Sequence, residues 1–413
     1  TGDMEFDAVT VSSGDTLDIN GQRVEFGGNV TYESGATFDA DGLLVFHGGF
    51  TKYGTLNNAA SGDIMAMSTS GFPTFSYITG YRTFFANGGV QLGTGGFTSI
   101  PTAIIASGEL RTGTRNCSAT NLTIATGGEF DASDNTHTIS GDFTTSGGLI
   151  GKSAVKFDDT DSNTTGFINC GSDSGIDDKF DGGGTIEAWI KPNSKGQLEN
   201  YGGIIASKVF WYFSTTRDSG SNTCKLTFKQ FFDGDDSEWN TTDHVITYNK
   251  WNHVAVTYDN GNVANNPIMY VNGKQVAVTR DQAATGTRNS DAGYNFFIGN
   301  YDANDNMHFD GTIAMVRYFD DIRTESEIRA DMFNKHADMA NTGDLLAMWQ
   351  FDEGTGTTID NKGSVGAAAD GTLTAGSVSG GWEGAGTFTK GTSTIDMTGN
   401  GTVGIAGGVT SFH

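Results

Sequence analysis

The sequence predicts an all-β protein in which short, glycine-rich strand repeats flank a larger β module. Glycine supplies 60 of the 413 residues and proline only 4, which favours tight turns between strands over proline-rich linkers. Aromatic side chains make up 11% of the chain, so large rings are available for a core although the apolar share is only 36%. Alternating apolar and polar residues run in short stretches towards both ends and in longer stretches in the middle.

A unit of about 21 residues occurs twice in succession near the start of the chain. Segment Val9–Asn29 aligns with Val30–Gly49 so that Leu17-Asp18 matches Phe38-Asp39. Each unit contains three short alternating runs with glycine between them, and a repeat of this length indicates stacked structural units. We therefore predict β-repeats over residues 1–50, in the form of a β-solenoid or a layered β-meander.

Two more copies of the unit occur later in the chain, on either side of the middle region. Leu122–Asp142 is a third copy and Phe388–Gly408 a weaker fourth, so residues 122–151 and 377–413 are also predicted to form β-repeats. The stretch between the second and third copies, residues 51–121, keeps the glycine and threonine content but loses the spacing. It is predicted to be an irregular β region.

The middle of the chain, from Lys152 onward, carries longer strands. Thr185–Pro192 alternates Ile and Ala with Glu, Trp and Lys, and Trp251–Asp259 places its valines on one face. Asn272-Gly273 separates two alternating stretches, which is the strongest short-range signal for a β-hairpin. Thr324-Glu-Ser-Glu327 is a capping box, which predicts the start of a helix.

Five segments of this middle region come in a fixed order: SAVKFDD, IEAWIKP, WNHVAVTYD, MYVNGKQV and FDGTIAMVRYFDDIRTESEI. This order resembles that of the laminin-G-like jelly-roll family of concanavalin A-like lectins and glucanases. The resemblance implies a two-sheet antiparallel β-sandwich, a jelly roll, over residues 152–376. In many members of the family a segment like LLAMWQFDEGTGTTID precedes the domain, whereas here it follows, at Leu345–Asp360. It is either a closing strand or the remnant of a second copy.

Charge and composition argue against several classes of protein. The chain has 24 basic and 49 acidic residues and a net charge of −25, whereas nucleic-acid binding needs clustered Lys and Arg. No apolar stretch is long enough for a membrane span, and no signal peptide opens the chain. The cysteines, Cys117, Cys170 and Cys224, form no Cys-x-x-Cys pair and are predicted to be buried or half-buried thiols.

The sequence contains no catalytic motif, so we predict that the protein is not an enzyme. Related jelly-roll glycoside hydrolases use a Glu-x-Asp-x-x-Glu pattern, and the nearest match, Glu129-Phe-Asp131-Ala-Ser-Asp134, lacks the final Glu. The same columns of the repeat hold Asp18 and Asp39, which indicates a row of solvent-facing aspartates. Gly-x-Ser-x-Gly, HExxH and phosphate-loop patterns are also missing. A polysaccharide hydrolase is the less favoured alternative.

Aspartates in loops make Ca²⁺ the cofactor that this sequence suits best. Ca²⁺ takes six to eight oxygen ligands from carboxylates and carbonyls, and similar laminin-G-like domains bind it at loops on one edge of the sandwich. The resemblance points to Asp158 and Asp161, after the first strand, and to the pair Asp360 and Asp370 as metal ligands. The alternative is that these loop aspartates are simply solvated.

Sugar binding needs exposed aromatic rings that stack on the sugar, together with polar groups for its hydroxyls. The run Val209-Phe-Trp-Tyr-Phe213 and the isolated Trp239 supply the candidates, and we predict ligand binding by Trp211, Tyr212 and Trp239. Neighbouring side chains of a strand point to opposite faces, so about half of the run has to point inward. The alternative for all three residues is packing in the core.

A repeat shaft interrupted by a lectin-like domain resembles phage virion proteins such as tail fibres, tailspikes and capsid fibres. The resemblance implies a non-enzymatic attachment protein at a virion or another extracellular surface. Its expected partners are a cell-surface glycan or polysaccharide, other virion proteins and further copies of the same chain in a homotrimer. The alternatives are a bacterial cell-surface adhesin and a purely structural decoration protein of a capsid or tail.

Overall fold

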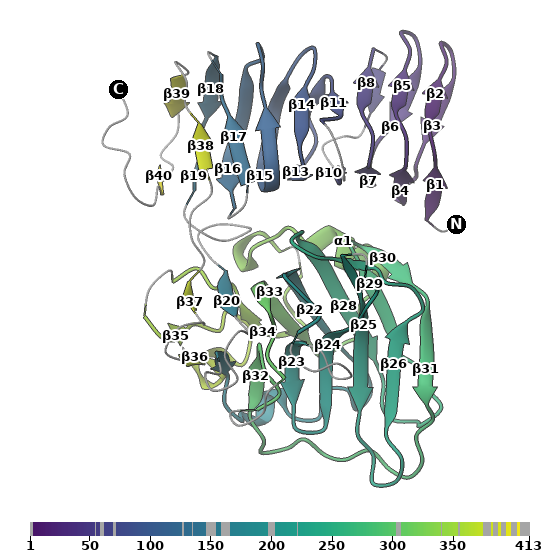
Figure 1. Ribbon diagram of the computed structural model, residues 1–413, viewed down its shortest axis with the longest axis vertical. Coiled ribbons are helices and arrows are strands. Elements are labelled where there is room, and N and C mark those ends of the chain that lie inside the picture. The colour runs from purple at the N-terminus through teal and green to yellow at the C-terminus, as the bar shows by residue number, and fades with distance from the viewer. Residues whose placement is uncertain are drawn as a thin grey trace. The chain divides into compact units, whose positions relative to one another are not determined.

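A computed structural model describes residues 3–374 except 54, 58–61, 69–71, 126–127, 134, 146–153, 158–165, 197–202, 221, 303–306, 340 and 354–355, together with 381–382, 387–389, 394–397 and 403–404. Contacts divide the chain into two compact units, one of Thr1–Lys152 with Gly384–His413 and one of Ser153–Glu383. Both are built from β-strands (Figure 1), which confirms the predicted all-β class.

The first unit is a β-solenoid, in which successive coils of the chain add strands to parallel sheets (Figure 1). One sheet contains β1 (Met4–Phe6), β4 (Arg23–Phe26), β7 (Leu43–Phe46), β10 (Asp63–Ala66), β13 (Thr83–Asn87), β15 (Phe97–Arg111), β16 (Cys117–Ile124), β19 (Phe143–Thr144) and β40 (Val403–Gly404). A second contains β2 (Val9–Val11), β5 (Val30–Tyr32), β8 (Phe50–Lys52), β11 (Thr74–Phe75), β14 (Val90–Leu92), the end of β15, β17 (Gly128–Asp131) and β38 (Thr387–Thr389). The remaining strands are β3 (Thr16–Asp18), β6 (Thr37–Asp39), β9 (Thr55–Asn57), β12 (Ile78–Thr79), β18 (Thr136–Ile139) and β39 (Thr394–Met397).

The pairing of the first coils follows the repeat that the sequence shows. Val9 pairs with Val30, 21 residues later, and Leu17 pairs with Phe38. Identical positions of consecutive units therefore lie one above the other, and the parallel pairing decides in favour of a solenoid over a meander.

Residues 51–121 continue the same stack, although the sequence predicted an irregular β region. Ile64 of β10 pairs in parallel with Leu44 of β7. The loops differ in length, so that Phe50 pairs with Phe75, 25 residues later. Because the loops differ in length, equivalent residues no longer recur at a constant spacing in the sequence, although the strands still pair. The prediction of irregular structure was wrong for this reason.

Phenylalanine rings stack through the core of the solenoid. The rings of Phe6 and Phe26 lie 5.8 Å apart and those of Phe26 and Phe46 5.1 Å apart. Phe46 also contacts Phe50 at 5.0 Å and Phe75 at 5.6 Å, and it is fully buried. In the first three coils one repeated residue thus builds an aromatic column, because each coil places its ring on the ring of the coil before. The equivalent positions of the next two coils are Ala66 and Ala86.

The second unit is inserted between two consecutive coils of the solenoid. Phe130 of β17 precedes the insertion and Phe388 of β38 follows it, yet the two pair in parallel as neighbouring coils do. β39 and β40 pair in the same way with β18 and β19. Within the inserted unit, β20 (Val155–Phe157) pairs with β37 (Gly381–Trp382), so its first and last strands are neighbours.

The inserted unit is an antiparallel jelly roll of two sheets, as predicted (Figure 1). One sheet has the order β30 (Lys274–Val276), β29 (Ile268–Val271), β28 (Asn252–Tyr258), β22 (Gly184–Pro192), β33 (Gly311–Phe319), β20 and β37, with β34 (Leu345–Trp349) also on β33. The other has the order β31 (Val278–Gln282), β26 (Ser237–Thr241), β25 (Thr223–Gln230), β24 (Trp211–Asp218), β23 (Gly203–Lys208), β32 (Phe296–Ile298), β21 (Phe167–Asn169), β36 (Gly371–Thr374) and β35 (Thr358–Ile359), with β27 (Ile246–Thr247) on β25.

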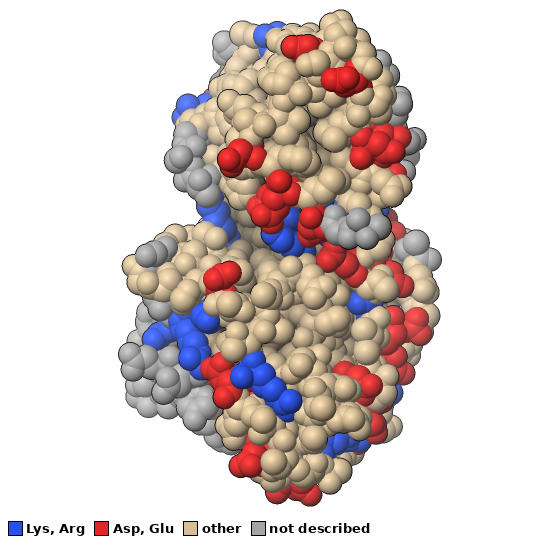
Figure 2. Space-filling view, turned by 90° about the vertical axis from the view of Figure 1, so that its right-hand side faces the viewer, with Lys and Arg blue, Asp and Glu red and all other residues tan. Residues whose placement is uncertain are grey.

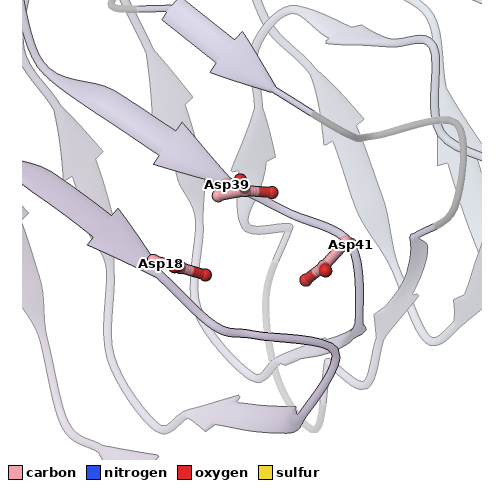
Figure 3. Close-up of side chains that lie close together, drawn as sticks. All are labelled: Asp18, Asp39 and Asp41. Carbon is pink, nitrogen blue, oxygen red and sulfur yellow. The ribbon is translucent and has the colours of Figure 1, made fainter.

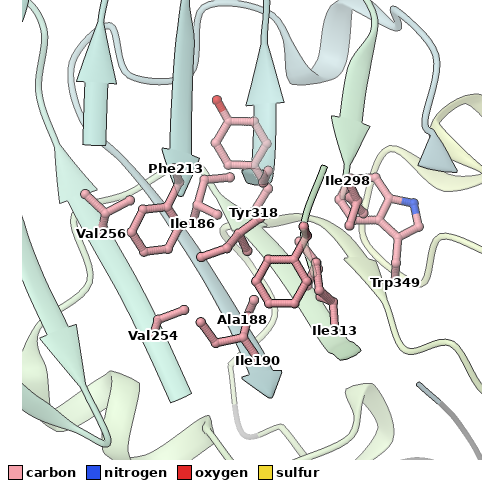
Figure 4. Close-up of a cluster of buried hydrophobic side chains, with 14 of the residues drawn as sticks. Ile186, Ala188, Ile190, Phe213, Val254, Val256, Ile298, Ile313, Tyr318 and Trp349 are labelled. Carbon is pink, nitrogen blue, oxygen red and sulfur yellow. The ribbon is translucent and has the colours of Figure 1, made fainter. Parts of the chain in front are cut away.

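Alternate side chains of the two sheets form the core of the jelly roll. Figure 4 shows Ile186, Ala188 and Ile190 of β22 beside Val254 and Val256 of β28, and all five are fully buried. These are the residues that sequence alternation placed on one face of each strand. The three cysteines of the chain are buried, free thiols.

Three local predictions in this unit are confirmed. Asn272 and Gly273 have φ angles of 51° and 69° and join β29 to β30 in a hairpin. Thr324 begins α1 (Glu325–Asp331) through a capping box. Leu345–Trp349 forms β34 on β33, so the segment LLAMWQFDEGTGTTID supplies a closing strand.

Charged side chains are buried on the side of β22, β28 and β33 that faces away from this core. Arg317 Nη1 donates to Glu187 Oε1 at 2.8 Å, and Arg317 Nη2 donates to the carbonyl of Asn334. His253 Nε2 lies 3.6 Å from Glu187 Oε2. Burial, together with the charges of Arg317 and Arg323, holds the pKa of His253 well below its usual value. His253 is therefore neutral in the folded protein at neutral pH.

Stability should fall as the pH falls below about 6.5, the usual pKa of a histidine. In that range the unfolded chain binds a proton at His253 that the folded chain does not, which lowers the free energy of unfolding by up to about 1.4 kcal/mol per pH unit. Urea unfolding of the full chain between about pH 7 and pH 5 measures this change. His253→Gln should lose this part of the pH dependence and His244→Gln should keep it. Equal pH slopes in all three proteins would contradict the assignment.

Candidate functional site

The aromatic residues predicted to bind a ligand are buried. Trp211 and Trp239 belong to the core between the sheets, with 1% and 0% of their surface exposed. Tyr212 points the other way but is also only 1% exposed, because its ring packs against Phe231 and Tyr301. A sugar cannot stack on any of the three, so this prediction was wrong. Alternation along the strand was anticipated, but the structure covers both faces of β24.

Of the four aspartates predicted to bind Ca²⁺, the structure describes Asp360 and Asp370. Asp158 and Asp161 lie outside the described residues. Asp360 pairs with Lys362 Nζ at 3.1 Å, and Asp370 Oδ1 accepts the backbone N–H of Asn361 at 2.8 Å. Both carboxylates thus have partners from the protein, and Ca²⁺ binding by these residues stays a prediction.

Three carboxylates do come together in the solenoid, at Asp18, Asp39 and Asp41 (Figure 3). One oxygen of each lies within 4.8 Å of the others. Asp18 and Asp39 are partners in the parallel pair β3–β6. Asp18 Oδ1 accepts the N–H of Asn20 at 2.8 Å, and Asp41 Oδ1 accepts that of Gly21 at 2.6 Å. The cluster follows from the repeat, which stacks Asp39 on Asp18. Asp18 caps its own turn, and Asp41 bonds to the turn of the preceding coil.

Charge does not gather into one large patch on the face drawn in Figure 2. Asp and Glu side chains are scattered over this face, and Lys and Arg lie among them. No helix in the described part of the chain is long and apolar enough to cross a membrane. The distribution of charge on this face therefore does not mark a functional site.

A polar pocket of about 570 Å³ lies between three loops of the jelly roll. The first loop follows the 3₁₀ turn η2 (Ser174–Ile176), the second joins β28 to β29, and the third joins β31 to β32. The pocket is lined by Asp181, Asn260, Gly261, Asn262, Val263, Gly286, Thr287, Arg288 and Ser290. Every lining residue except Val263 is polar or glycine, so hydroxyl, amide, carboxylate and backbone groups are available to a ligand.

A hydrogen-bonded ion network joins the first and third loops at this pocket. Arg288 Nη1 donates to Asp178 Oδ1 at 2.7 Å, and Arg288 Nη2 donates to Asp181 Oδ2 at 2.8 Å. Ser290 Oγ donates to Asp178 Oδ2 at 2.7 Å. Burial raises the pKa of Asp178. Hydrogen bonds from Ser290 and from the N–H of Asp291, together with the charge of Arg288, lower it by more than burial raises it, so the pKa lies below its usual value. Asp178 therefore stays ionised at neutral pH.

The buried side chain of Lys208 links the same two loops. Lys208 is fully buried, and its Nζ donates to the carbonyl of Ile176 at 3.1 Å, to Asp291 Oδ1 at 2.9 Å and to Asp177 Oδ1. Asp291 Oδ2 accepts from Trp211 Nε1 at 2.9 Å. An ammonium group surrounded by two carboxylates and a carbonyl supplies the positive charge that these oxygens need. A cation belonging to the chain itself thus organises the loops.

Asn260 lines the pocket, and Tyr294 lies further along its third loop. Asn260 is only 6% exposed, and its Oδ1 has no hydrogen-bond partner among the described residues. An unpaired buried acceptor is unfavourable, but this oxygen exposes less than 1 Å² and is out of direct reach of a ligand in the pocket. Tyr294 lies on the same loop as Ser290, is 48% exposed and packs edge-on against Phe210 at 5.6 Å. Sequence reasoning missed all of these residues, because Asn- and Gly-rich loops occur throughout the chain.

Comparison with known proteins matches part of the chain to a family. Residues 163–329 match the model described as the concanavalin A-like lectin/glucanases superfamily, and this range contains every residue that lines the pocket. A search of the curated proteins found no match.

Solved structures similar to this chain are distant. A protein of Bacteroides ovatus ATCC 8483 assigned to carbohydrate binding is 21% identical, with 55% of this chain and 60% of that chain covered and a TM-score of 0.38. The heptameric SAP-like pentraxin from Limulus polyphemus is 13% identical, with 48% and 91% covered and a TM-score of 0.32. The enzymatically active domain of tailspike protein 2 from bacteriophage CBA120 is 12% identical, with 86% and 83% covered and a TM-score of 0.29. Residues 163–329 thus match a concanavalin A-like lectin/glucanase model, and they lie within the jelly roll that is inserted between coils of the β-solenoid.

Proposed function

We propose that the protein is a non-enzymatic attachment protein, whose lectin-like jelly roll binds a cell-surface glycan in the pocket between its three loops. The observation that carries the proposal is the pocket itself: about 570 Å³, lined almost entirely by polar residues and glycine, on a lectin-like fold. A volume of this size accommodates a small ligand.

The chemistry of the lining suits a sugar. Hydroxyls of a sugar both donate and accept hydrogen bonds, and the amide of Asn262 and the hydroxyl of Thr287 can do the same. Glycine at positions 261 and 286 lets a ligand approach the backbone closely. The exposed ring of Tyr294, on the same loop, offers an apolar surface.

The lining favours binding over hydrolysis. Glycoside hydrolases need two carboxyl groups on either side of the scissile bond. Asp181 is the carboxylate among the lining residues, and it is already paired with Arg288. This arrangement supports the prediction that the protein is not an enzyme.

A solenoid that carries a lectin-like module fits the setting of a phage virion, as a tail fibre, tailspike or capsid fibre. The proposal includes other virion proteins as partners and a homotrimer as the assembled form. Light scattering of the purified chain tests the trimer, and a stable monomer would count against it.

Binding should be observed with a panel of glycans and host polysaccharides, and it should survive EDTA because Lys208 and Arg288 hold the pocket loops. Thr287→Val, which removes one hydroxyl, should weaken binding about three- to tenfold. Thr242→Val makes the same change at an exposed site outside the pocket and should leave binding unchanged.

Two results would count against this function. If a folded chain binds no member of the panel, a purely structural role is favoured. If a glycan binds equally to wild type, Thr287→Val and Asn262→Ala, the ligand lies elsewhere on the molecule. Loss of binding in EDTA would instead assign a cation to the site.

A further inference from the structure

We infer that the pocket selects neutral sugars and rejects anionic ones, and that Asp181 is the residue that sets this preference. The inference rests on the proposed function and adds the class of sugar. It follows from how the charges at the pocket are already paired.

Arg288 is the cationic residue of the lining, and both ends of its guanidinium are in use. Nη1 binds Asp178 and Nη2 binds Asp181. A guanidinium with two free N–H groups would grip a carboxylate or a sulfate through two parallel hydrogen bonds. Here the protein's own carboxylates take one N–H of each Nη group and neutralise its charge, so the guanidinium attracts an external anion less strongly.

The two carboxylates on Arg288 differ in how firmly they are held. Asp178 is 27% exposed and also accepts bonds from Ser290 Oγ and from the backbone N–H of Asp291. The Asp181 side chain is 55% exposed. An anion that approaches Arg288 through the pocket therefore meets the charge of Asp181, whereas Asp178 is fixed behind it in the network.

Two further carboxylates accept hydrogen bonds from the backbone of residues that line the pocket. Asp233 Oδ1 accepts the N–H of Thr287 at 2.6 Å, and Asp259 Oδ1 accepts the N–H of Gly261 at 2.8 Å. Arg280 is the nearby cation, and it is engaged by the carbonyl of Val263 and by Ser237. The potential at the pocket is therefore negative, which favours a neutral ligand over an anion.

The expected size of the effect follows from Coulomb's law. One unit charge about 5 Å from a ligand anion changes affinity about tenfold at an effective dielectric constant of about 50, a value between those of a protein surface and of water. Asp181→Asn removes that charge and loosens the hold on Arg288 Nη2, because a neutral amide oxygen accepts a weaker hydrogen bond than a carboxylate does. The substitution is thus expected to convert a repulsive pocket into one that accepts anions.

The experiment uses the full chain and two kinds of probe. The first is an array on which each neutral oligosaccharide is paired with its sialylated and sulfated forms. The second is dextran sulfate with dextran as its neutral counterpart. Wild type should bind the neutral member of a pair at least about tenfold more tightly than the acidic member. Asp181→Asn should bind acidic members and dextran sulfate about tenfold more tightly than wild type does.

Two variants separate this effect from a general loss of negative charge. Asp243→Asn changes net charge equally at an exposed position outside the pocket and should behave as wild type. Asp181→Asn combined with Arg288→Gln should lose the gain for anions, because the gain depends on the loosened guanidinium. A wild type that prefers acidic members, or an Asp181→Asn protein that binds dextran sulfate no better than Asp243→Asn, overturns the inference. Absence of array binding by wild type refutes the glycan-binding function, while dextran sulfate still decides the role of Asp181.

Discussion

Arg317→Met should lower the free energy of unfolding of the jelly roll by about 3–5 kcal/mol. Arg317 is fully buried and binds the equally buried Glu187 at 2.8 Å and the carbonyl of Asn334. Methionine fills much of the space but leaves the Glu187 carboxylate without its compensating charge, which is the costly part of the change.

Tryptophan fluorescence measures this loss in the intact chain. All six tryptophans lie in the jelly-roll unit, so their signal in a urea titration reports on that unit alone. Arg217→Met is the matched control, since Arg217 is 46% exposed and pairs with Asp281 and Glu238 near the surface. That change should cost less than about 1 kcal/mol.

Replacing both partners tests the cause. Glu187→Met with Arg317→Met removes the unpaired charge and should recover most of the lost stability. If Arg317→Met costs no more than Arg217→Met, the buried pair is not what stabilises this face of the sheet.

Phe46→Ala should lower the stability of the solenoid by about 3–5 kcal/mol. The ring is fully buried and contacts Phe26, Phe50 and Phe75, so alanine leaves a cavity in the middle of the aromatic column. Phe6→Ala removes the same ring at the start of the column, where it is 38% exposed, and should cost roughly 1 kcal/mol.

Two signals recorded together locate this loss. Hydrogen exchange of the solenoid strands should rise in Phe46→Ala, whereas the tryptophan transition of the jelly roll should keep its midpoint. Equal losses for Phe46→Ala and Phe6→Ala would show that burial in the column does not set the stability of the coils.

The repeat and the jelly roll could be predicted from the sequence because their patterns are local. Val9 and Val30 are equivalent in the repeat and are paired in the structure, and the alternation of Ile186, Ala188 and Ile190 gives the buried face of β22. Residues 51–121 escaped prediction because coil length varies there while the pairing of strands persists. The third repeat copy was placed correctly in the stack, but Phe130 lies in the sheet of Val30 rather than in that of Phe38.

The pocket could not be predicted in the same way. Its lining comes from three loops around Asp181, Asn260 and Arg288, which are far apart in the sequence and meet only after the sheets have formed. Each loop alone looks like many other polar turns of this chain. Trp211 and Trp239 were predicted to bind a ligand because they are large aromatic residues, but a large aromatic side chain is as suited to a buried core as to a binding surface.

The insertion of the jelly roll between paired coils gives the module two covalent attachments. A protease that cut one of the two connections would leave the jelly roll joined through the other, with β38–β40 still hydrogen-bonded to β17–β19. Because β20 and β37 are neighbours, the module begins and ends at one place and occupies a single opening in the coil path. A different module with adjacent ends could fill the same opening without a new strand register in the solenoid, so this architecture allows the inserted module to be exchanged as a unit.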